Sequence, residues 1–221
     1  MNKPGSTEKT KLNRISHKAS DSISDLHSVL DDNLVAHVGI IFDGAPLVIP
    51  MAYGRIDNRL YLHGSSGSRL MRALTENPQV CVSITELNGI KVARSTFHTG
   101  MHYRSAVIFG RAELVSDADK NAAMDAISDS MIPGRMSEVR AHTKKELAAT
   151  LIIWVDLNET SVKISNNPVA DDEDDLGKGV WAGILPIITS IGTPIPADAE
   201  AASLPLPPSI VNFRTGSSDT R

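Results

Sequence analysis

Short apolar runs rich in valine, isoleucine and leucine follow one another through the middle of the chain, separated by turn signals. Such runs are typical of β-strands, and the dipeptides Asp43-Gly44 and Asn88-Gly89 are strong signals for tight hairpins. Pro50 indicates a strand edge or a bulge, and Gly110 indicates a bulge or a bend. The pattern predicts strands over residues 34–42, 46–54, 59–63, 79–85, 90–98, 103–115, 151–157 and 161–165.

Helical spacing is confined to a few segments between these runs. Ile23, Leu26 and Leu30 lie three and four residues apart, as one buried face of a short helix requires. Thr143 and Glu146 form a capping box. The pattern predicts helices over residues 21–33, 68–77, 116–132 and 143–150. Because strands and helices do not alternate regularly, the predicted fold class is mainly β (α+β), an antiparallel barrel with peripheral helices.

Composition divides the chain into three parts. Residues 1–18 are polar and basic, and we expect a flexible N-terminal arm, followed by one main domain over residues 19–188. Residues 189–221 form a proline-rich extension that we expect to lie extended on the surface. The acidic run 171–175 lacks the residue spacing of an EF-hand, so a solvated acidic loop is favoured over a calcium site.

Overall composition excludes several classes of function. The chain has 221 residues, 41% of them hydrophobic, which allows one domain with a real core. A net charge of −4 and an aromatic content of 4% argue against nucleic-acid binding. Cys81 is the single cysteine, which excludes an internal disulfide and suggests a buried thiol. No run approaches the about 18 apolar residues of a membrane span, and no secretory signal is visible, so we expect a cytoplasmic protein.

Small polar residues join the predicted strand 59–63 to the predicted helix 68–77. Backbone N–H groups at a helix start and serine hydroxyls are hydrogen-bond donors, and an arginine offers a bidentate fork to phosphate oxygens. The residues concerned are Gly64, Ser65, Ser66, Ser68 and Arg69. Two interpretations remain open at this corner. The corner is either a phosphate-binding site, although not of the Walker A type, or a serine-capped helix start with an exposed arginine.

A second polar cluster lies between the predicted strands 90–98 and 103–115. Its members are Arg94, Ser95, His98, His102, Tyr103, Arg104 and Ser105. His98 and His102 are four residues apart, but no carboxylate or cysteine completes a ligand set, so we expect no metal site. A cation beside a reduced flavin ring would stabilise its negative charge, and Arg94 or Arg104 could serve in this way.

Taken together, the two clusters resemble the FMN-binding split-barrel superfamily. The resemblance rests on the segments LYLHGSSGSRLMRALTENPQVCVSIT and ARSTFHTGMHYRSAVIFGRAEL and extends over about residues 14–188. It is strongest to the branch of pyridoxamine 5'-phosphate oxidase-related flavoproteins, which is close to the nitroimidazole-resistance proteins. The resemblance implies a six-stranded antiparallel split β-barrel, a homodimer, and FMN bound at the subunit interface.

The resemblance also implies roles for individual residues. The phosphate-binding Ser-Arg pair of the family falls on Ser68 and Arg69, and the strand end that contacts the flavin falls on His63 and Gly64. The polar positions that flank the ring fall on Arg94, Ser95, Tyr103, Arg104 and Ser105. His63 is the catalytic candidate, because a histidine near the flavin is linked to chemistry in the nitroimidazole-resistance relatives. Trp181 either covers the flavin across the dimer or anchors the core.

Two departures narrow the expected activity. Leu70 follows the Ser-Arg pair where the vitamin B6 oxidase has lysine, and no RLHDR-type signature follows residue 180. The resemblance therefore implies flavin binding without vitamin B6 oxidase activity. The leading hypothesis is an FMN-dependent oxidoreductase that acts on a small organic molecule. A reduced nicotinamide would bind only transiently, because the chain has no G-x-G-x-x-G motif.

The runner-up hypothesis is a non-catalytic protein that binds flavin or haem. His63, His98 or His102 could supply an axial imidazole to haem iron. A deazaflavin is a further alternative to FMN, because it also presents a phosphate and a tricyclic ring. A third hypothesis is an interaction module whose cofactor site has decayed.

Overall fold

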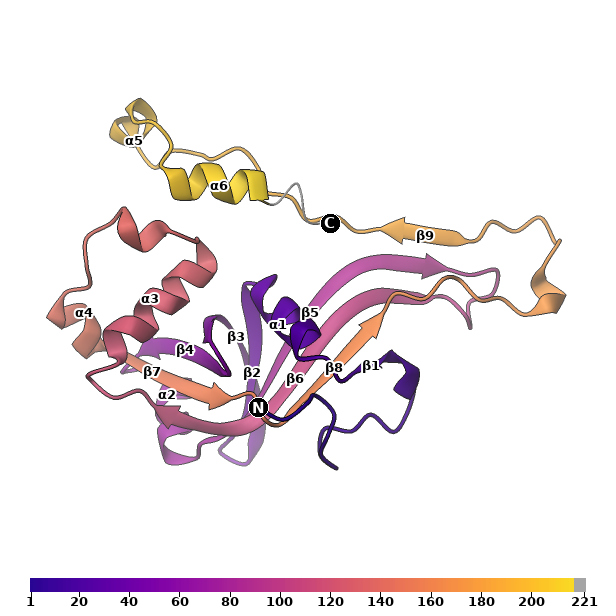
Figure 1. Cartoon of the computed structure of the whole chain (residues 1–221), viewed down its shortest axis with the longest axis horizontal. Helices are drawn as coiled ribbons and strands as arrows, with labels where there is room; N and C mark the ends of the chain where they lie inside the picture. Colours follow the sequence, from indigo (N-terminus) through magenta and orange to yellow (C-terminus); the bar gives the residue numbers. More distant parts are fainter. Residues whose placement is uncertain (217–221) are drawn as a thin grey trace.

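Antiparallel strands form the body of the protein in the computed structural model, which describes residues 1–216, with side chains up to Phe213. The strands are β1 (Ala19–Ser20), β2 (Val35–Phe42), β3 (Ala45–Ile56), β4 (Arg59–Ser65), β5 (Gln79–Val92), β6 (Gly100–Leu114), β7 (Thr150–Asp156), β8 (Thr160–Ser165) and β9 (Gly183–Pro186). Their order is β1-β8-β6-β7-β4-β3-β2-β5-β9, and an additional β5–β6 pairing closes the ring β6-β7-β4-β3-β2-β5 (Figure 1). The predicted antiparallel barrel is therefore confirmed, with β1, β8 and β9 added at its edges.

Four helices pack against the barrel, and two belong to the C-terminal segment, which leaves it (Figure 1). They are α1 (Ile23–Asp31), α2 (Arg69–Glu76), α3 (Lys120–Met131), α4 (Lys144–Ala149), α5 (Ala199–Ser203) and α6 (Pro208–Gly216), with 3-10 turns at Ser16–Lys18, Arg135–Ser137 and Glu173–Asp175. The predicted capping box of α4 is confirmed, because Thr143 and Glu146 each bond the backbone N–H of the other. No helix in the described part of the chain is long and apolar enough to cross a membrane.

Alternating strand positions fill the inside of the barrel. On β4, Leu60 and Leu62 are fully buried in the main core, to which α1 also contributes Leu26. Tyr61 points to the other face and packs beneath α3 with Ile127. Because successive side chains of a strand point to opposite faces, β4 joins both apolar clusters.

The predicted hairpin at Asn88-Gly89 is wrong. β5 runs through this dipeptide without turning and pairs with β6, and a shift in register between Leu87 and Gly89 accommodates the irregularity as a bulge. A Cβ at Gly89 would lie 3.0 Å from the carbonyl oxygen of Leu185, so glycine also allows β9 to approach. The chain turns instead at residues 93–99, at the far end of the long β5–β6 ribbon (Figure 1).

The expected free N-terminal arm lies against the barrel. The N–H of Gly5 donates to the carbonyl oxygen of Thr160 at 2.8 Å, and the hydroxyl of Thr7 donates to Glu159 at 2.7 Å. Thr10 is only 2% exposed. The ammonium of Lys9 lies 4.9 Å from the ring centroid of Phe109 on β6. These contacts connect residues far apart in the chain, so local composition could not reveal them.

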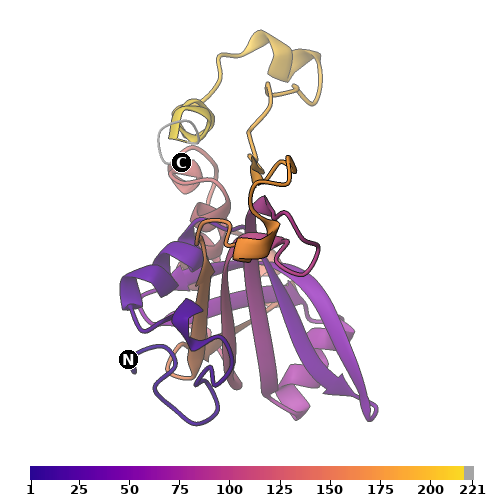
Figure 2. The same cartoon turned by 90° about the vertical axis from the view of Figure 1, so that its right-hand side faces the viewer.

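The proline-rich C-terminal extension is not simply extended. It contains the short helices α5 and α6, and it rises away from the barrel before returning (Figure 2). The return is held by Ser209, whose N–H and hydroxyl donate to the carboxylate of Glu138 at 2.8 and 2.5 Å. Residues 217–221 of the predicted extension lie outside the described residues.

Candidate functional site

The corner between β4 and α2 is shaped by Ser65. Its carbonyl oxygen accepts the N–H of Ser68 at 2.8 Å, and its hydroxyl oxygen accepts the N–H of Gly67 at 3.2 Å. The N–H of Ser66 donates to the carbonyl oxygen of Ala149 at 3.0 Å, which ties the corner to the last residue of α4, just before β7. The N–H groups of the turn itself are thus committed to holding its shape.

Other donors of this corner have no hydrogen-bond partner among the described residues. Ser68 is the N-cap residue of α2, yet its side chain makes no capping hydrogen bond, and the hydroxyl of Ser66 is also unpaired. The first N–H groups of α2 are unpaired, as at any helix start. Arg69 is exposed, and its guanidinium carbon lies 5.1 Å from the ring centroid of Phe42. Hydroxyls, backbone N–H groups and one cation are therefore available to an anion, whereas the simple serine cap is not formed.

Close packing explains why position 64 is a glycine. A Cβ at this position would lie 2.7 Å from Cγ of Met71, which is fully buried. Glycine thus lets the end of β4 pack directly on α2. The sequence predicted both the turn and the helix at this corner, and the structure brings Gly64, Ser65, Ser66, Ser68 and Arg69 together there.

The second predicted cluster lies at the other end of the sheet. Leu114, at the end of β6, pairs with Ile153 of β7, and the start of β7 at Thr150 pairs with Ser65. The loop 93–99 lies beyond Gly100, the opposite end of β6. The strand between them spans roughly 45 Å at about 3.3 Å per residue. One subunit therefore does not bring Arg94 and Ser95 to the corner that holds Arg69.

Arg94 is paired with the acidic run instead. Its N–H and its guanidinium each donate to the carboxylate of Asp171 at 2.6 Å, and the Asp171 side chain is 2% exposed. Burial raises the pKa of Asp171, but the hydrogen bonds and charge of Arg94 outweigh burial and leave this pKa below its usual value. His98 adds a contact of 3.3 Å to Asp172. The expectation of a solvated acidic loop is therefore wrong for Asp171, the first residue of the run. This residue is buried and holds the loop 93–99 through Arg94.

Replacing Asp171 with asparagine is expected to loosen this loop. Amide hydrogen exchange in residues 93–99 should become faster at neutral pH, because Arg94 loses its counter-charge. The contact of the unmodified protein should persist at and above the ordinary aspartate pKa of about 3.9 and disappear at lower pH, since the folded-state pKa is depressed. Asp174→Asn is the control, because Asp174 is exposed and unpaired among the described residues. Equal exchange rates in the two variants would contradict this role of Asp171.

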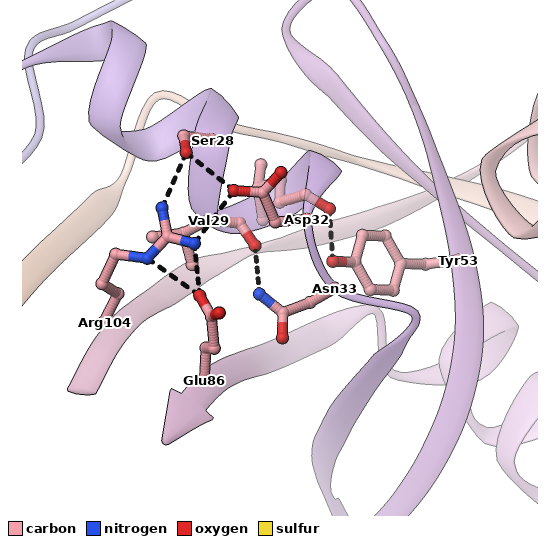
Figure 3. A network of polar contacts seen from close by, with 8 residues as sticks. Ser28, Val29, Asp32, Asn33, Tyr53, Glu86 and Arg104 are labelled. Carbon is pink, nitrogen blue, oxygen red and sulfur yellow. Dashed lines mark hydrogen bonds and ion pairs between the residues drawn. The ribbon is translucent and has the colours of Figure 1, made fainter. Parts of the chain in front are cut away.

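Arg104 is the centre of a polar network between α1, β5 and β6 (Figure 3). Its guanidinium donates to Glu86 at 2.8 Å, to the hydroxyl of Ser28 at 2.7 Å and to Asp32 at 2.9 Å. Arg104 therefore has its charge neutralised by two carboxylates. Like Arg94, it offers no unpaired positive charge to a cofactor within the described chain.

The remaining predicted residues are not brought together in one place: His63 directly precedes the corner on β4, whereas Tyr103 and Ser105 lie along β6. His63 is half-buried on β4, its Nδ1 has no partner among the described residues, and burial lowers its pKa. Ser105 pairs with Thr85 and Lys163 in the middle of the sheet, and Tyr103 lies 5.9 Å from the ammonium of Lys18. Trp181 is 62% exposed, so it is not a core anchor.

Sequence reasoning missed an exposed apolar face on β2 and β3. Val35 and Ile41 of β2 are 49% and 57% exposed, and Val48 of β3 is 60% exposed. His37 lies on the same face of β2 and is also exposed. The period of two along β2 places these residues together, but it could not show that this face lacks a covering layer in one subunit.

No group of three or more histidine, cysteine, aspartate or glutamate side chains in the described residues is arranged to hold a metal ion. Cys81 is half-buried, and burial raises the pKa of its thiol. These groups therefore do not define a metal centre or an activated nucleophile.

The closed antiparallel ring and the polar strand-to-helix corner define a split-barrel protein, and comparison with known proteins agrees. A family profile described as pyridoxamine 5'-phosphate oxidase matches residues 22–164. Because this match covers most of the chain, the protein belongs to that family.

Two solved structures are similar over nearly their whole length. The FAD and heme binding protein from Mycobacterium smegmatis is 41% identical, with a TM-score of 0.87, and the match covers 89% of this chain and 97% of that one. The flavocytochrome Anf3 from Azotobacter vinelandii is 33% identical, with a TM-score of 0.88, and the match covers 97% and 99%.

A putative 5-nitroimidazole antibiotic resistance protein from Bacteroides thetaiotaomicron shares the fold at 22% identity, with a TM-score of 0.56 over 66% of this chain and 86% of that one. No curated protein matches the chain.

Proposed function

We propose that the protein binds a flavin and also haem, and acts as a flavin-dependent oxidoreductase on a small organic molecule. The observation that carries the flavin proposal is the corner between β4 and α2. Arg69 and the hydroxyls of Ser66 and Ser68 have no polar partner among the described residues. This donor set suits a phosphate, which every flavin nucleotide carries. The two relatives named for FAD and heme, or as a flavocytochrome, support the same choice.

A bound flavin would supply hydride and electron transfer, and residues of the chain would hold and orient it. Arg69, Ser66, Ser68 and the first N–H groups of α2 would bind the phosphate. His63 has a lowered pKa, so its imidazole is neutral near neutral pH and could accept a proton at the unpaired Nδ1. Arg94 and Arg104 are paired with carboxylates and would not act as free cations beside the flavin ring.

We further propose a homodimer with the flavin at the subunit interface. Val35, Ile41 and Val48 form an exposed apolar face, which suits burial against a second copy. The two predicted clusters lie at opposite ends of one sheet, so a partner subunit is needed if Ser95, Tyr103 or Trp181 is to approach a flavin held at Arg69. Light scattering of the cofactor-loaded protein should give the mass of a dimer.

The purified protein tests this proposal directly. Its absorption spectrum should show the two bands of an oxidised flavin, together with an intense Soret band when haem is bound. Mass spectrometry of the ligand released by denaturation should identify FMN, FAD or a deazaflavin. Reduction by a nicotinamide, followed by reoxidation with candidate small-molecule acceptors, tests the oxidoreductase activity. A protein that takes up none of these flavins on reconstitution would contradict the proposal.

A further inference from the structure

A cavity of about 380 Å³ lies between the paired strands β4 and β7 and the start of α3, which are neighbours in Figure 1. Pockets of this size hold small-molecule ligands. The floor of the cavity is buried, because Tyr61 and Ala123 are only 8% and 2% exposed, whereas Leu114 at its rim is exposed. No residue of β2 lines it, so it is separate from the apolar face that we assign to the subunit interface.

Two neighbouring strands place an arginine and two aromatic side chains along one wall of the cavity. Arg59 and Tyr61 are two residues apart on β4 and therefore point to the same face of the sheet. Trp154 of β7 is the cross-strand partner of Tyr61. The guanidinium carbon of Arg59 lies 3.9 Å from the ring centroid of Trp154. A guanidinium that rests on an aromatic face is held in place, and its fork of N–H donors stays available at its edge.

These donors have no protein partner among the described residues. Arg59 forms no ion pair, and the carboxylate of its cross-strand neighbour Asp156 accepts the N–H of Asn158 at 2.7 Å instead. The hydroxyl of Tyr61 and the indole N–H of Trp154 make no hydrogen bond within the described part of the chain either. A cation and two neutral donors are thus available on one wall of a cavity with a buried floor.

The other charge in the lining limits the kind of ligand. Asp119 forms no ion pair with Arg59, is exposed, and accepts the hydroxyl of Ser116 at 2.7 Å. Its carboxylate disfavours a ligand with two negative charges, such as a phosphate dianion, whereas Arg59 can bind one carboxylate in a bidentate manner. The rest of the lining is apolar and consists of Ile56, Leu114, Val115, Ala122 and Ala123.

We infer that this cavity binds a small aromatic carboxylate. Arg59 holds the carboxylate group, and the ring packs against Tyr61, Ile56 and Val115. Arg59 begins β4 and Ser65 ends it, which separates this site from the flavin corner by roughly 20 Å at about 3.3 Å per residue. Binding at this site goes beyond the proposed function and does not depend on a flavin.

Benzoate is the probe, benzamide is its uncharged counterpart, and acetate is a carboxylate without a ring. Trp181→Phe leaves Trp154 as the only tryptophan, so its fluorescence reports binding at the cavity in the full chain. Calorimetry measures the same affinities without relying on fluorescence. Benzoate should bind at least about tenfold more tightly than benzamide or acetate, a difference of about 1.4 kcal/mol.

Variants of Arg59 test the assigned residue. Arg59→Gln keeps a long side chain on Trp154 but removes the charge, and it should lower benzoate affinity at least about tenfold. Arg59→Lys keeps the charge without the fork and should restore part of this affinity. Arg111→Ala is the control, because Arg111 is exposed, has no ion pair in the described chain and does not line the cavity. Thermal unfolding checks that each variant is folded.

Three results would overturn the inference. The first is an unmodified protein that shows no saturable binding of benzoate. The second is Arg59→Gln binding benzoate as tightly as Arg111→Ala does, or benzamide binding as tightly as benzoate. The third is a benzoate titration of the flavin-loaded protein that changes the flavin absorption and leaves Trp154 unaffected, because benzoate would then bind at the flavin instead.

Discussion

Arg69→Ala is expected to weaken flavin-nucleotide binding by roughly ten- to over a hundredfold. The substitution removes a charge-assisted contact to the phosphate, and such contacts contribute about 1.5–3 kcal/mol each. A change of about 1.4 kcal/mol is a factor of ten in affinity. The fold itself should be little affected, because Arg69 is exposed and its guanidinium group stacks only on Phe42. Its effect on the free energy of unfolding should stay within about ±0.5 kcal/mol.

The chain offers a matched control three residues further along α2. Arg72 is exposed and has no ion pair among the described residues, so Arg72→Ala removes the same charge without touching the corner. Riboflavin, which lacks the phosphate, should lose far less affinity than FMN or FAD in Arg69→Ala. Titrations of riboflavin, FMN and FAD, followed by flavin fluorescence, distinguish the loss of a phosphate contact from the loss of a surface charge. If Arg69→Ala binds FMN and FAD as tightly as the unmodified protein does, this corner does not bind the flavin phosphate.

Gly54→Ala is expected to lower the free energy of unfolding by about 1–3 kcal/mol, the usual range for overpacking. A Cβ at Gly54 on β3 would lie 2.7 Å from the Cα of Ile127 and 2.9 Å from the carbonyl oxygen of Ala126. Both atoms belong to the backbone of α3, so the clash cannot be relieved by rotating a side chain. The helix must shift, and it packs on Tyr61 and Ile152 through its buried residues.

Chemical denaturation monitored by circular dichroism measures this effect. Gly100→Ala is the control, because the nearest atom to its added Cβ would be Cε of the flexible Lys91 side chain at 3.9 Å. This control should remain within about ±0.5 kcal/mol of the unmodified protein. If Gly54→Ala unfolds at the same denaturant concentration as Gly100→Ala, α3 does not pack on β3 as closely as the structure shows.

The corner at Arg69 and the loop at Arg94 show how far the sequence could predict the candidate site. The corner depends on neighbouring residues, namely a strand that ends at Ser65 and a helix that begins at Arg69, and both were predicted from local signals. The loop depends on Asp171, which is 77 residues away from Arg94. An acidic run in the sequence has many possible partners, so nothing local could show that its first carboxylate is buried.

The sequence alone determined the antiparallel barrel, the capping box at Thr143 and the strand-to-helix corner, because apolar periodicity and short-range hydrogen bonds act between neighbours in the chain. Tertiary structure decided the rest. It carried β5 straight through Asn88-Gly89, since pairing with β6 outweighed the local preference for a turn. It also placed Arg59 of β4 and Ala123 of α3 on one cavity. Pairing and cavities join residues that are distant in the chain, and their energies depend on distances that only the folded molecule sets.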